Sequence, residues 1–105
     1  MFHYKSPAKL NLFLKVLNKR IDGFHNIQSI FQLIDFYDYL SFEKSKDNRV
    51  KITCDIKNLE SNNLIEMAIE LFRKKFNVKK YGLNIKLKKN IPIGAGLGGG
   101  SSNAA

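Results

Sequence analysis

The sequence predicts an α+β fold with a mixed or antiparallel sheet, and three observations support this prediction. Several segments alternate apolar and polar residues with the period of a half-buried strand. One segment instead repeats apolar residues at helical spacing. A glycine-rich loop followed by Ser, Asn and Ala is typical of the start of a helix. The expected order is therefore strands, one helix, a further strand, the glycine loop and a second helix.

The first two strands are expected at residues 9–17 and 27–35, where apolar residues have a spacing compatible with β-structure. Between them, Asp22-Gly23 marks a turn within residues 18–26. The first part of the chain is therefore predicted as two strands joined by this turn.

Three shorter strands are expected at residues 39–43, 50–55 and 83–88. In the last two, every second residue is apolar and the residues between are mostly polar or basic, so one face of each strand should be buried. Asp47-Asn48 is expected to form a hairpin-like turn between the first two of these strands.

A helix is predicted between residues 64 and 76, with Asn62 or Asn63 as its N-cap. Its apolar stripe consists of Leu64, Ile65, Ala68, Ile69, Phe72 and Phe76. A helix lying on a membrane surface is the alternative for this segment. The polar face is not strongly basic, which argues against that alternative.

Composition indicates one globular domain, because the 105 residues are 44% hydrophobic and 26% charged. No linker divides the chain. The single cysteine, Cys54, excludes an internal disulfide and a Cys-rich zinc site, and His3 and His25 form no metal-spaced pair with it, so no metal site is predicted. The N-terminus lacks the apolar core of a signal peptide, and no apolar run approaches the ~18 residues of a membrane span. We therefore expect a cytoplasmic protein without a membrane partner.

The net charge of +9 is concentrated in residues 44–90, whereas residues 91–105 carry no charged side chain. A basic protein prefers anionic partners such as nucleotides or nucleic acids, although lysines that simply decorate solvated faces give the same composition. Lysine far outnumbers arginine, which argues against nucleic acid because bidentate base readout favours arginine.

The strongest signal is the loop of residues 94–100, which holds five glycines. Glycine adopts positive φ and allows close approach of a ligand, so successive N–H groups can form an anion-binding nest. The start of the following helix adds partial positive charge, and Ser101 and Ser102 offer hydroxyls to phosphate or to a phosphate-bound Mg²⁺. An NTPase P-loop is excluded because no lysine follows the glycines. A tight connection without a ligand is the alternative.

The pattern Pro92-x-Gly94-x-Gly96-Leu97-Gly98, followed by Ser101-Ser102-x-Ala104-Ala105, resembles the phosphate loop of the GHMP kinases. Three further blocks resemble the branch of that family whose members phosphorylate 4-diphosphocytidyl-2-C-methyl-D-erythritol. They are Ser6-Pro7-Ala8-Lys9-Leu10-Asn11-Leu12, then Arg20-x-Asp22-Gly23-Phe24-His25 with Gln28-Ser29-Ile30-Phe31-Gln32, and Asn62-Asn63-Leu64-Ile65.

This resemblance implies an ATP-dependent kinase of non-mevalonate isoprenoid biosynthesis that phosphorylates the 2-hydroxyl of the methylerythritol moiety. It implies two lobes, the first similar to ribosomal protein S5 domain 2, with the active site between them. Residues 1–105 would form part of the N-terminal, ATP-binding lobe, truncated at the start of the phosphate-loop helix. The C-terminal lobe and the catalytic aspartate would lie beyond residue 105, so the chain alone is expected to be inactive.

The resemblance also implies the site residues. Lys9 would lie beside the reacting hydroxyl as the catalytic lysine, and Asn11, Phe24 and His25 would bind the cytidine-diphosphate-linked substrate. ATP, with Mg²⁺, would be bound by Pro92, Ile93, Gly94, Ala95, Gly96, Leu97, Gly98, Gly99, Gly100, Ser101 and Ser102. Contacts of Asn62, Asn63 and Leu64 with adenine or its ribose are also implied, with helix capping as the alternative. Ala95 departs from a glycine common in the family.

Two other functions stay open at this stage. The chain could be a small basic nucleic-acid-binding module derived from a decayed kinase, using Lys74, Lys75, Lys79, Lys80, Lys86, Lys88 and Lys89. It could also be a subunit completed by a separate chain. The sequence carries no signal for an oligomeric state.

Overall fold

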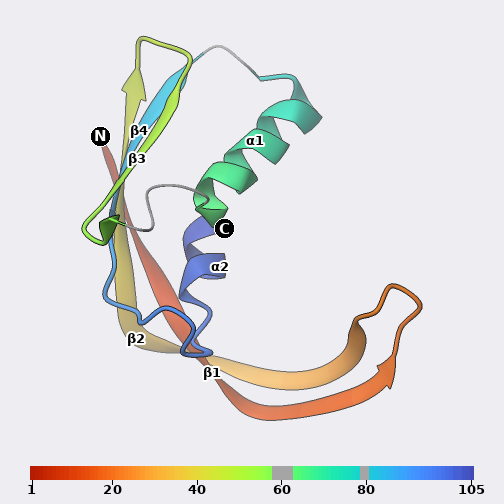
Figure 1. The fold of residues 1–105 in the computed structure, drawn as a ribbon. Helices are drawn as coiled ribbons and strands as arrows, with labels where there is room; N and C mark the ends of the chain where they lie inside the picture. Colours follow the sequence, from red (N-terminus) through yellow and green to blue (C-terminus); the bar gives the residue numbers. More distant parts are fainter. Residues whose placement is uncertain (58–62, 79–80) are drawn as a thin grey trace.

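The computed structural model describes residues 1–57, 63–78 and 81–105. Within these residues, four strands and two helices follow one another (Figure 1). Their bounds are β1 Phe2–Lys19, β2 His25–Ser45, β3 Val50–Cys54, α1 Leu64–Phe76, β4 Gly82–Lys88 and α2 Gly99–Ala104. The predicted α+β order is confirmed.

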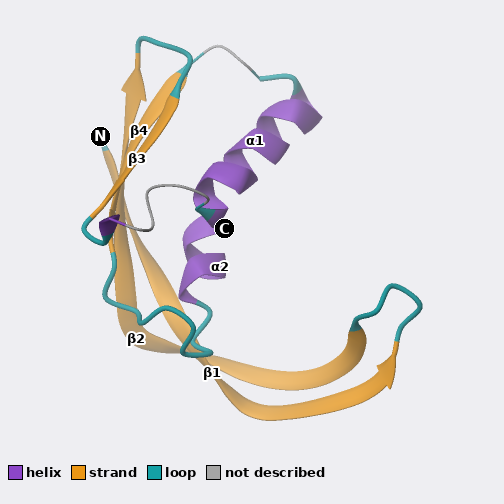
Figure 2. Cartoon of the chain, viewed as in Figure 1, coloured by secondary structure: helices purple, strands orange, loops and turns teal. Residues whose placement is uncertain are grey.

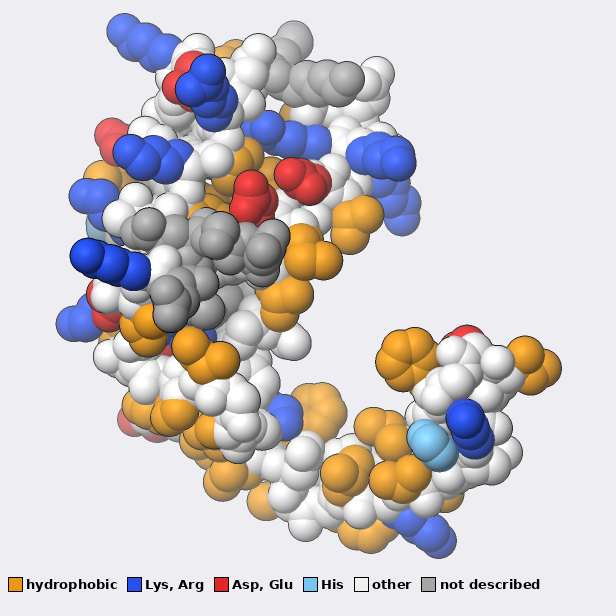
Figure 3. Space-filling model, in the orientation of Figure 1, with side chains coloured by type: hydrophobic (Ala, Val, Ile, Leu, Met, Phe, Trp, Pro, Cys, Tyr) orange, Lys and Arg blue, Asp and Glu red, His pale blue; other side chains and the backbone are white. Residues whose placement is uncertain are grey.

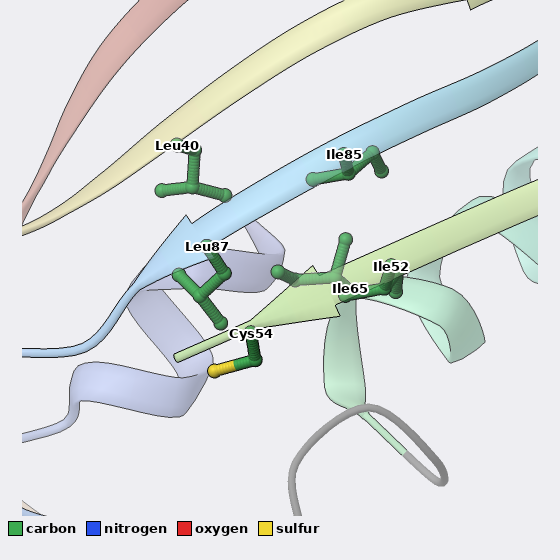
Figure 4. Close-up of a cluster of buried hydrophobic side chains, with 6 residues drawn as sticks. All are labelled: Leu40, Ile52, Cys54, Ile65, Ile85 and Leu87. Atoms are coloured by element: carbon green, nitrogen blue, oxygen red, sulfur yellow. The ribbon is translucent and has the colours of Figure 1, made fainter. Parts of the chain in front are cut away.

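The strands form one mixed sheet in the order β1-β2-β4-β3. The β1–β2 and β2–β4 pairs are antiparallel, and β3 runs parallel to β4. Both helices lie on the same side of this sheet (Figures 1 and 2). The core fills the space between sheet and helix α1, where Leu40, Ile52, Cys54, Ile65, Ile85 and Leu87 pack together (Figure 4).

Strands β1 and β2 continue past the sheet as a curved two-stranded arm, formed by residues 9–19 and 25–34 (Figure 1). Many apolar side chains of the arm are exposed, among them Leu12, Val16, Ile30 and Phe31 (Figure 3). The turn at its tip is closed by the Asp22 carboxylate, which accepts a hydrogen bond from Phe24 N at 3.1 Å. The turn predicted at Asp22-Gly23 is therefore confirmed.

Two predictions about the strands are wrong. The segments 27–35 and 39–43 belong to one strand, β2, because Asp35 and Phe36 form a bulge that keeps the pairing with β1 continuous. The segment around Asp47 does reverse the chain, but it does not make a hairpin, since β4 lies between β2 and β3. A parallel β3–β4 pair needs a crossover connection, and α1 provides it.

The predictions for α1, β3 and β4 are confirmed. The side chain of Asn63 caps α1 by accepting a hydrogen bond from Ile65 N at 2.9 Å, whereas Asn62 lies outside the described residues. In β4, Ile85 and Leu87 are buried while Lys86 and Lys88 are exposed, as the alternation requires. Neither helix in the described part of the chain has the length and apolarity needed to cross a membrane.

Candidate functional site

The glycine loop connects the end of β4 to α2 and passes close to strand β1. Gly94, Gly96 and Gly98 have φ values of 68°, 74° and 69°, in the left-handed region that favours glycine. An added Cβ at Gly94 or Gly96 would meet no atom within 4 Å, so the loop's surface is open there. The backbone is thus accessible to a ligand, as the anion-nest hypothesis requires.

A pocket of about 350 Å³ lies between this loop and the start of α1. Asn63 and Leu64 form part of its wall, and so do Leu87 and Lys89. The loop side is formed by Pro92, Ile93, Gly94, Ala95, Gly96, Leu97, Gly98, Gly99, Gly100 and Ser101, with Asn103 behind them. No carboxylate is among the described residues that line it, so the pocket suits an anionic ligand.

Lys9 fastens the loop to strand β1. Its amide N donates to Leu97 O at 2.9 Å, and its ammonium Nζ donates to Gly96 O at 2.7 Å. The side chain of Lys9 also runs past Gly98, where an added Cβ would lie 3.1 Å from Lys9 Cε. The structure therefore places the predicted catalytic lysine against the predicted phosphate loop.

Ser101 and Ser102 differ in their surroundings. Ser101 is exposed and lines the pocket. The hydroxyl of Ser102 instead accepts a hydrogen bond from Ser6 Oγ at 2.9 Å. Ser101 is therefore the hydroxyl that a bound ligand can reach directly.

The predicted substrate residues lie away from this pocket. Asn11 is exposed two residues after Lys9 on the arm, and its Oδ1 accepts from Ser29 Oγ at 3.3 Å. Phe24 and His25 are at the tip of the arm, and the Phe24 side chain is 71% exposed. The structure thus brings Lys9 and the predicted ATP-binding loop together and keeps Phe24 and His25 at a second location.

The sequence analysis missed a buried ion pair beneath the loop. Asp38 and Lys89 meet at 2.5 Å, and their side chains are 0% and 4% exposed. Strand alternation could have shown that both side chains are buried, since Asp38 is in phase with buried Leu40 and Lys89 with buried Leu87. The hypothesis that Lys89 belongs to a nucleic-acid-binding surface is therefore wrong, because its side chain is buried.

The pKa of Asp38 lies below its ordinary value. Burial acts to raise this pKa, but hydrogen bonds from the Lys89 ammonium, from Asn103 and from the backbone amides of Asn90 and Ile91 outweigh that effect. Asp38 is therefore ionised in the folded protein at neutral pH.

This depressed pKa predicts acid destabilisation. A carboxylate with a lowered folded pKa stabilises the fold above its unfolded pKa of ~3.9, and this contribution is lost as the pH falls through the folded pKa. We expect the temperature of the unfolding midpoint to decrease as the pH is lowered below about 4. In Asp38→Asn this decrease should be smaller. Circular dichroism melts across this range test it, with exposed Asp22→Asn as the control. An equally steep drop in Asp38→Asn would contradict the assignment.

Comparison with known proteins agrees with this geometry. Residues 63–105 match the family model described as GHMP kinases N terminal domain. The segment that contains α1, β4, the glycine loop and α2 is thus similar to the N-terminal domain of the GHMP kinases.

Nearly the whole chain is also similar to the N-terminal portion of 4-diphosphocytidyl-2-C-methyl-D-erythritol kinases. It is 48% identical over 104 residues to the one from Francisella philomiragia, covering 98% of this chain and 38% of that protein. It is 54% identical over 103 residues to the one from Prochlorococcus marinus strain AS9601, covering 96% of this chain and 33% of that protein. A crystal structure of 4-(cytidine 5'-diphospho)-2C-methyl-D-erythritol kinase superposes with a TM-score of 0.79 at 34% identity, over 98% of this chain and 37% of that one. The chain therefore spans between 33% and 38% of the length of these relatives.

Proposed function

We propose that this chain supplies the N-terminal, ATP-binding lobe of a cytoplasmic kinase that phosphorylates the 2-hydroxyl of 4-diphosphocytidyl-2-C-methyl-D-erythritol. The observation that carries the proposal is the carboxylate-free pocket at the glycine loop, with Lys9 bonded to the loop's backbone. The names of the relatives supply the substrate and, with it, a place in non-mevalonate isoprenoid biosynthesis.

The residues that line the pocket suit both the base and the phosphates of ATP. Leu64 and Pro92 present exposed apolar surface on which a flat base can pack, and Asn63 adds polar groups beside it. The triphosphate would follow the open backbone from Gly94 to Ser101, where amide N–H groups offer donors to its oxygens. On this assignment the phosphates would lie along the loop that Lys9 contacts at Gly96.

Lys9 is suited to phosphoryl transfer. This reaction needs positioning and charge stabilisation more than covalent chemistry from the protein. An ammonium has three N–H donors, so Lys9 can bind Gly96 O and a phosphate oxygen at the same time. The same positive charge favours ionisation of a neighbouring catalytic carboxylate.

Mg²⁺ would enter together with ATP. Magnesium is commonly held by substrate phosphates, waters and one or two protein oxygens, and it neutralises phosphate charge when bound. No group of three His, Cys, Asp or Glu side chains suited to a metal occurs within residues 1–57, 63–78 and 81–105. The exposed hydroxyl of Ser101 fits a site of this kind, and it is the oxygen we assign to the metal or to a phosphate.

Phe24 and His25 would bind the cytidine end of the second substrate. The exposed ring of Phe24 offers a face for stacking, and the ring edge of His25 offers a donor and an acceptor to a base. Asn11 lies along the arm on the way from this tip to Lys9, and we assign it to the substrate as well.

The test is a kinetic one on the complete kinase, with ATP and the cytidine substrate varied in turn. We expect Phe24→Ala to raise the KM for the cytidine substrate by about tenfold and to leave the KM for ATP unchanged, because stacking is worth ~1–3 kcal/mol per base. Phe2→Ala is the matched control, because Phe2 is also an exposed phenylalanine and lies at the start of β1, away from the tip of the arm. Absence of phosphoryl transfer to this substrate would refute the proposed function, and a change in the KM for ATP would refute the role of Phe24.

A further inference from the structure

Four polar side chains are gathered under the glycine loop, between the sheet and α2. Ser6 comes from β1, Asp38 from β2, Lys89 from the end of β4 and Asn103 from α2. Ser6, Asp38 and Asn103 are buried, and the Lys89 side chain is nearly so. Each is hydrogen-bonded, and no buried side-chain N or O atom of the described residues lacks a partner. Such a complete network is a specific arrangement, not an accident of packing.

The Asp38 carboxylate accepts hydrogen bonds from the segments on both sides of the loop. Oδ1 accepts hydrogen bonds from Asn90 N at 2.7 Å and Ile91 N at 2.9 Å, on the segment that enters the loop. Oδ2 accepts from Lys89 Nζ at 2.5 Å and from Asn103 Nδ2 at 2.9 Å. Asn103 belongs to the helix that leaves the loop. The Asp38 carboxylate is thus hydrogen-bonded both to residues 89–91, before the loop, and to Asn103, after it.

Asn103 closes the network. Its Oδ1 accepts from Lys89 Nζ at 3.0 Å, so the lysine is shared between the carboxylate and the amide. Its Nδ2 also donates to Ser6 Oγ at 2.9 Å, and Ser6 donates in turn to Ser102. The first turns of α2 are therefore fixed to β1 and β2 by side-chain hydrogen bonds.

The loop itself has few other restraints. The positions of Gly94 and Gly96 face open space, and the main tie in the middle of the loop is the contact of Lys9 with Gly96 and Leu97. A nest of amide N–H groups binds phosphate well only if it is held in shape before the ligand arrives. The shape of this loop therefore depends on how its two ends are anchored.

Stability alone is a poor explanation for the buried pair. Replacing a buried ion pair by packed apolar side chains is often neutral or stabilising, because desolvation offsets much of the attraction. The hydrogen bonds of the Asp38 carboxylate point instead to a role in organising the segments that it connects. We infer that Asp38 is a positioning residue for ATP, which acts through Lys89 and Asn103 to hold the two ends of the glycine loop at the separation that binds the phosphates.

This inference rests on the proposed function, and Asp38→Asn in the complete kinase tests it. The amide oxygen can still accept from Asn90 N and Ile91 N, but the amide nitrogen cannot accept from Lys89 or Asn103. We expect the KM for ATP to rise by about 10- to 100-fold, since a small misplacement of binding groups has effects of this size. The KM for the cytidine substrate should not change. A purely structural role would lower the active fraction and leave both KM values as they were, which would overturn the inference.

Asp55→Asn is the matched control. Asp55 Oδ1 accepts from Lys89 N at 2.9 Å, so the same chemical change is made beside the same segment, but at an exposed carboxylate outside the buried network. Its KM for ATP should stay within about twofold of the parent. A rise equal to that of Asp38→Asn would mean that any lost carboxylate near the loop has this effect, and the inference would fail.

Two further measurements distinguish failure of this inference from failure of the proposed substrate and from a variant that does not fold. ATP affinity, measured by calorimetric titration, gives a result even if the parent protein phosphorylates a different alcohol, so failure of the proposed substrate does not decide the inference. If Asp38→Asn does not fold, Ser6→Ala replaces it, because it removes only the acceptor for Asn103 and the donor to Ser102. We expect this variant to bind ATP at least about threefold more weakly, because two hydrogen bonds of the network are lost. An unchanged ATP affinity in a folded variant would overturn the inference.

Discussion

Replacing Lys9 by methionine is expected to lower the kcat of the complete kinase by about 100- to 1,000-fold, as for removal of one preorganised donor to a developing charge. Methionine keeps most of the length and apolar surface of the side chain, so the stem beside Gly98 can be retained. The ammonium is lost, and with it the hydrogen bond to Gly96 O. Loss of the loop contact should appear in the KM for ATP, and loss of charge stabilisation in kcat.

Steady-state kinetics with both substrates measure these two effects separately. Lys15→Met is the matched control, because Lys15 is an exposed lysine further along the same strand, opposite Gln28 on the arm. That variant should retain the parental kcat and both KM values. An unchanged kcat in Lys9→Met, with only the KM for ATP raised, would reduce Lys9 to a support for the loop.

The parts of the fold that obey local rules could be predicted from the sequence. The alternation in β3 and β4 depends only on each strand having one buried face, and it gave the correct buried residues Ile52, Cys54, Ile85 and Leu87. The N-cap at Asn63 likewise depends on a side chain and an amide two residues apart.

The parts that depend on distant segments could not be predicted. Asp47-Asn48 looks like a hairpin turn because the nearby sequence cannot show that β4, over thirty residues later, takes the place beside β2. The continuity of β2 has the same explanation, since the bulge at Asp35 and Phe36 is defined only by pairing with β1.

The residues of the site also divide into those that a local motif predicts and those that only distant strand pairing brings together. The glycine loop is one contiguous motif, so its residues were found together. The partnership of Asp38 with Lys89 follows instead from the antiparallel register, in which the neighbouring residues Tyr39 and Lys88 are paired. Alternation can place each of the two charged residues on the buried face of its own strand, but only the register brings the two charges together.

Replacing Gly98 by alanine is the second change expected to have a large effect. Its φ of 69° is unfavourable for any residue with a Cβ, at a cost of ~1–2 kcal/mol. The added methyl group would also lie 3.1 Å from Lys9 Cε and 3.3 Å from Lys9 Cγ, so the lysine must shift. We expect the KM for ATP to rise at least about tenfold from strain in the loop, and kcat to fall as well because Lys9 is displaced.

Gly23→Ala separates strain from contact with Lys9. Gly23 has a φ of 88° at the tip of the arm, and an added Cβ there would meet no atom within 4 Å. Its strain is comparable, but it lies far along the chain from the pocket, so the KM for ATP should be unchanged while thermal stability falls. If both variants lose stability equally and neither alters ATP kinetics, the loop would be a simple connection. If only Gly98→Ala alters both KM and kcat, the methyl group acts on the phosphate loop and on Lys9 together, as their contact in the structure requires.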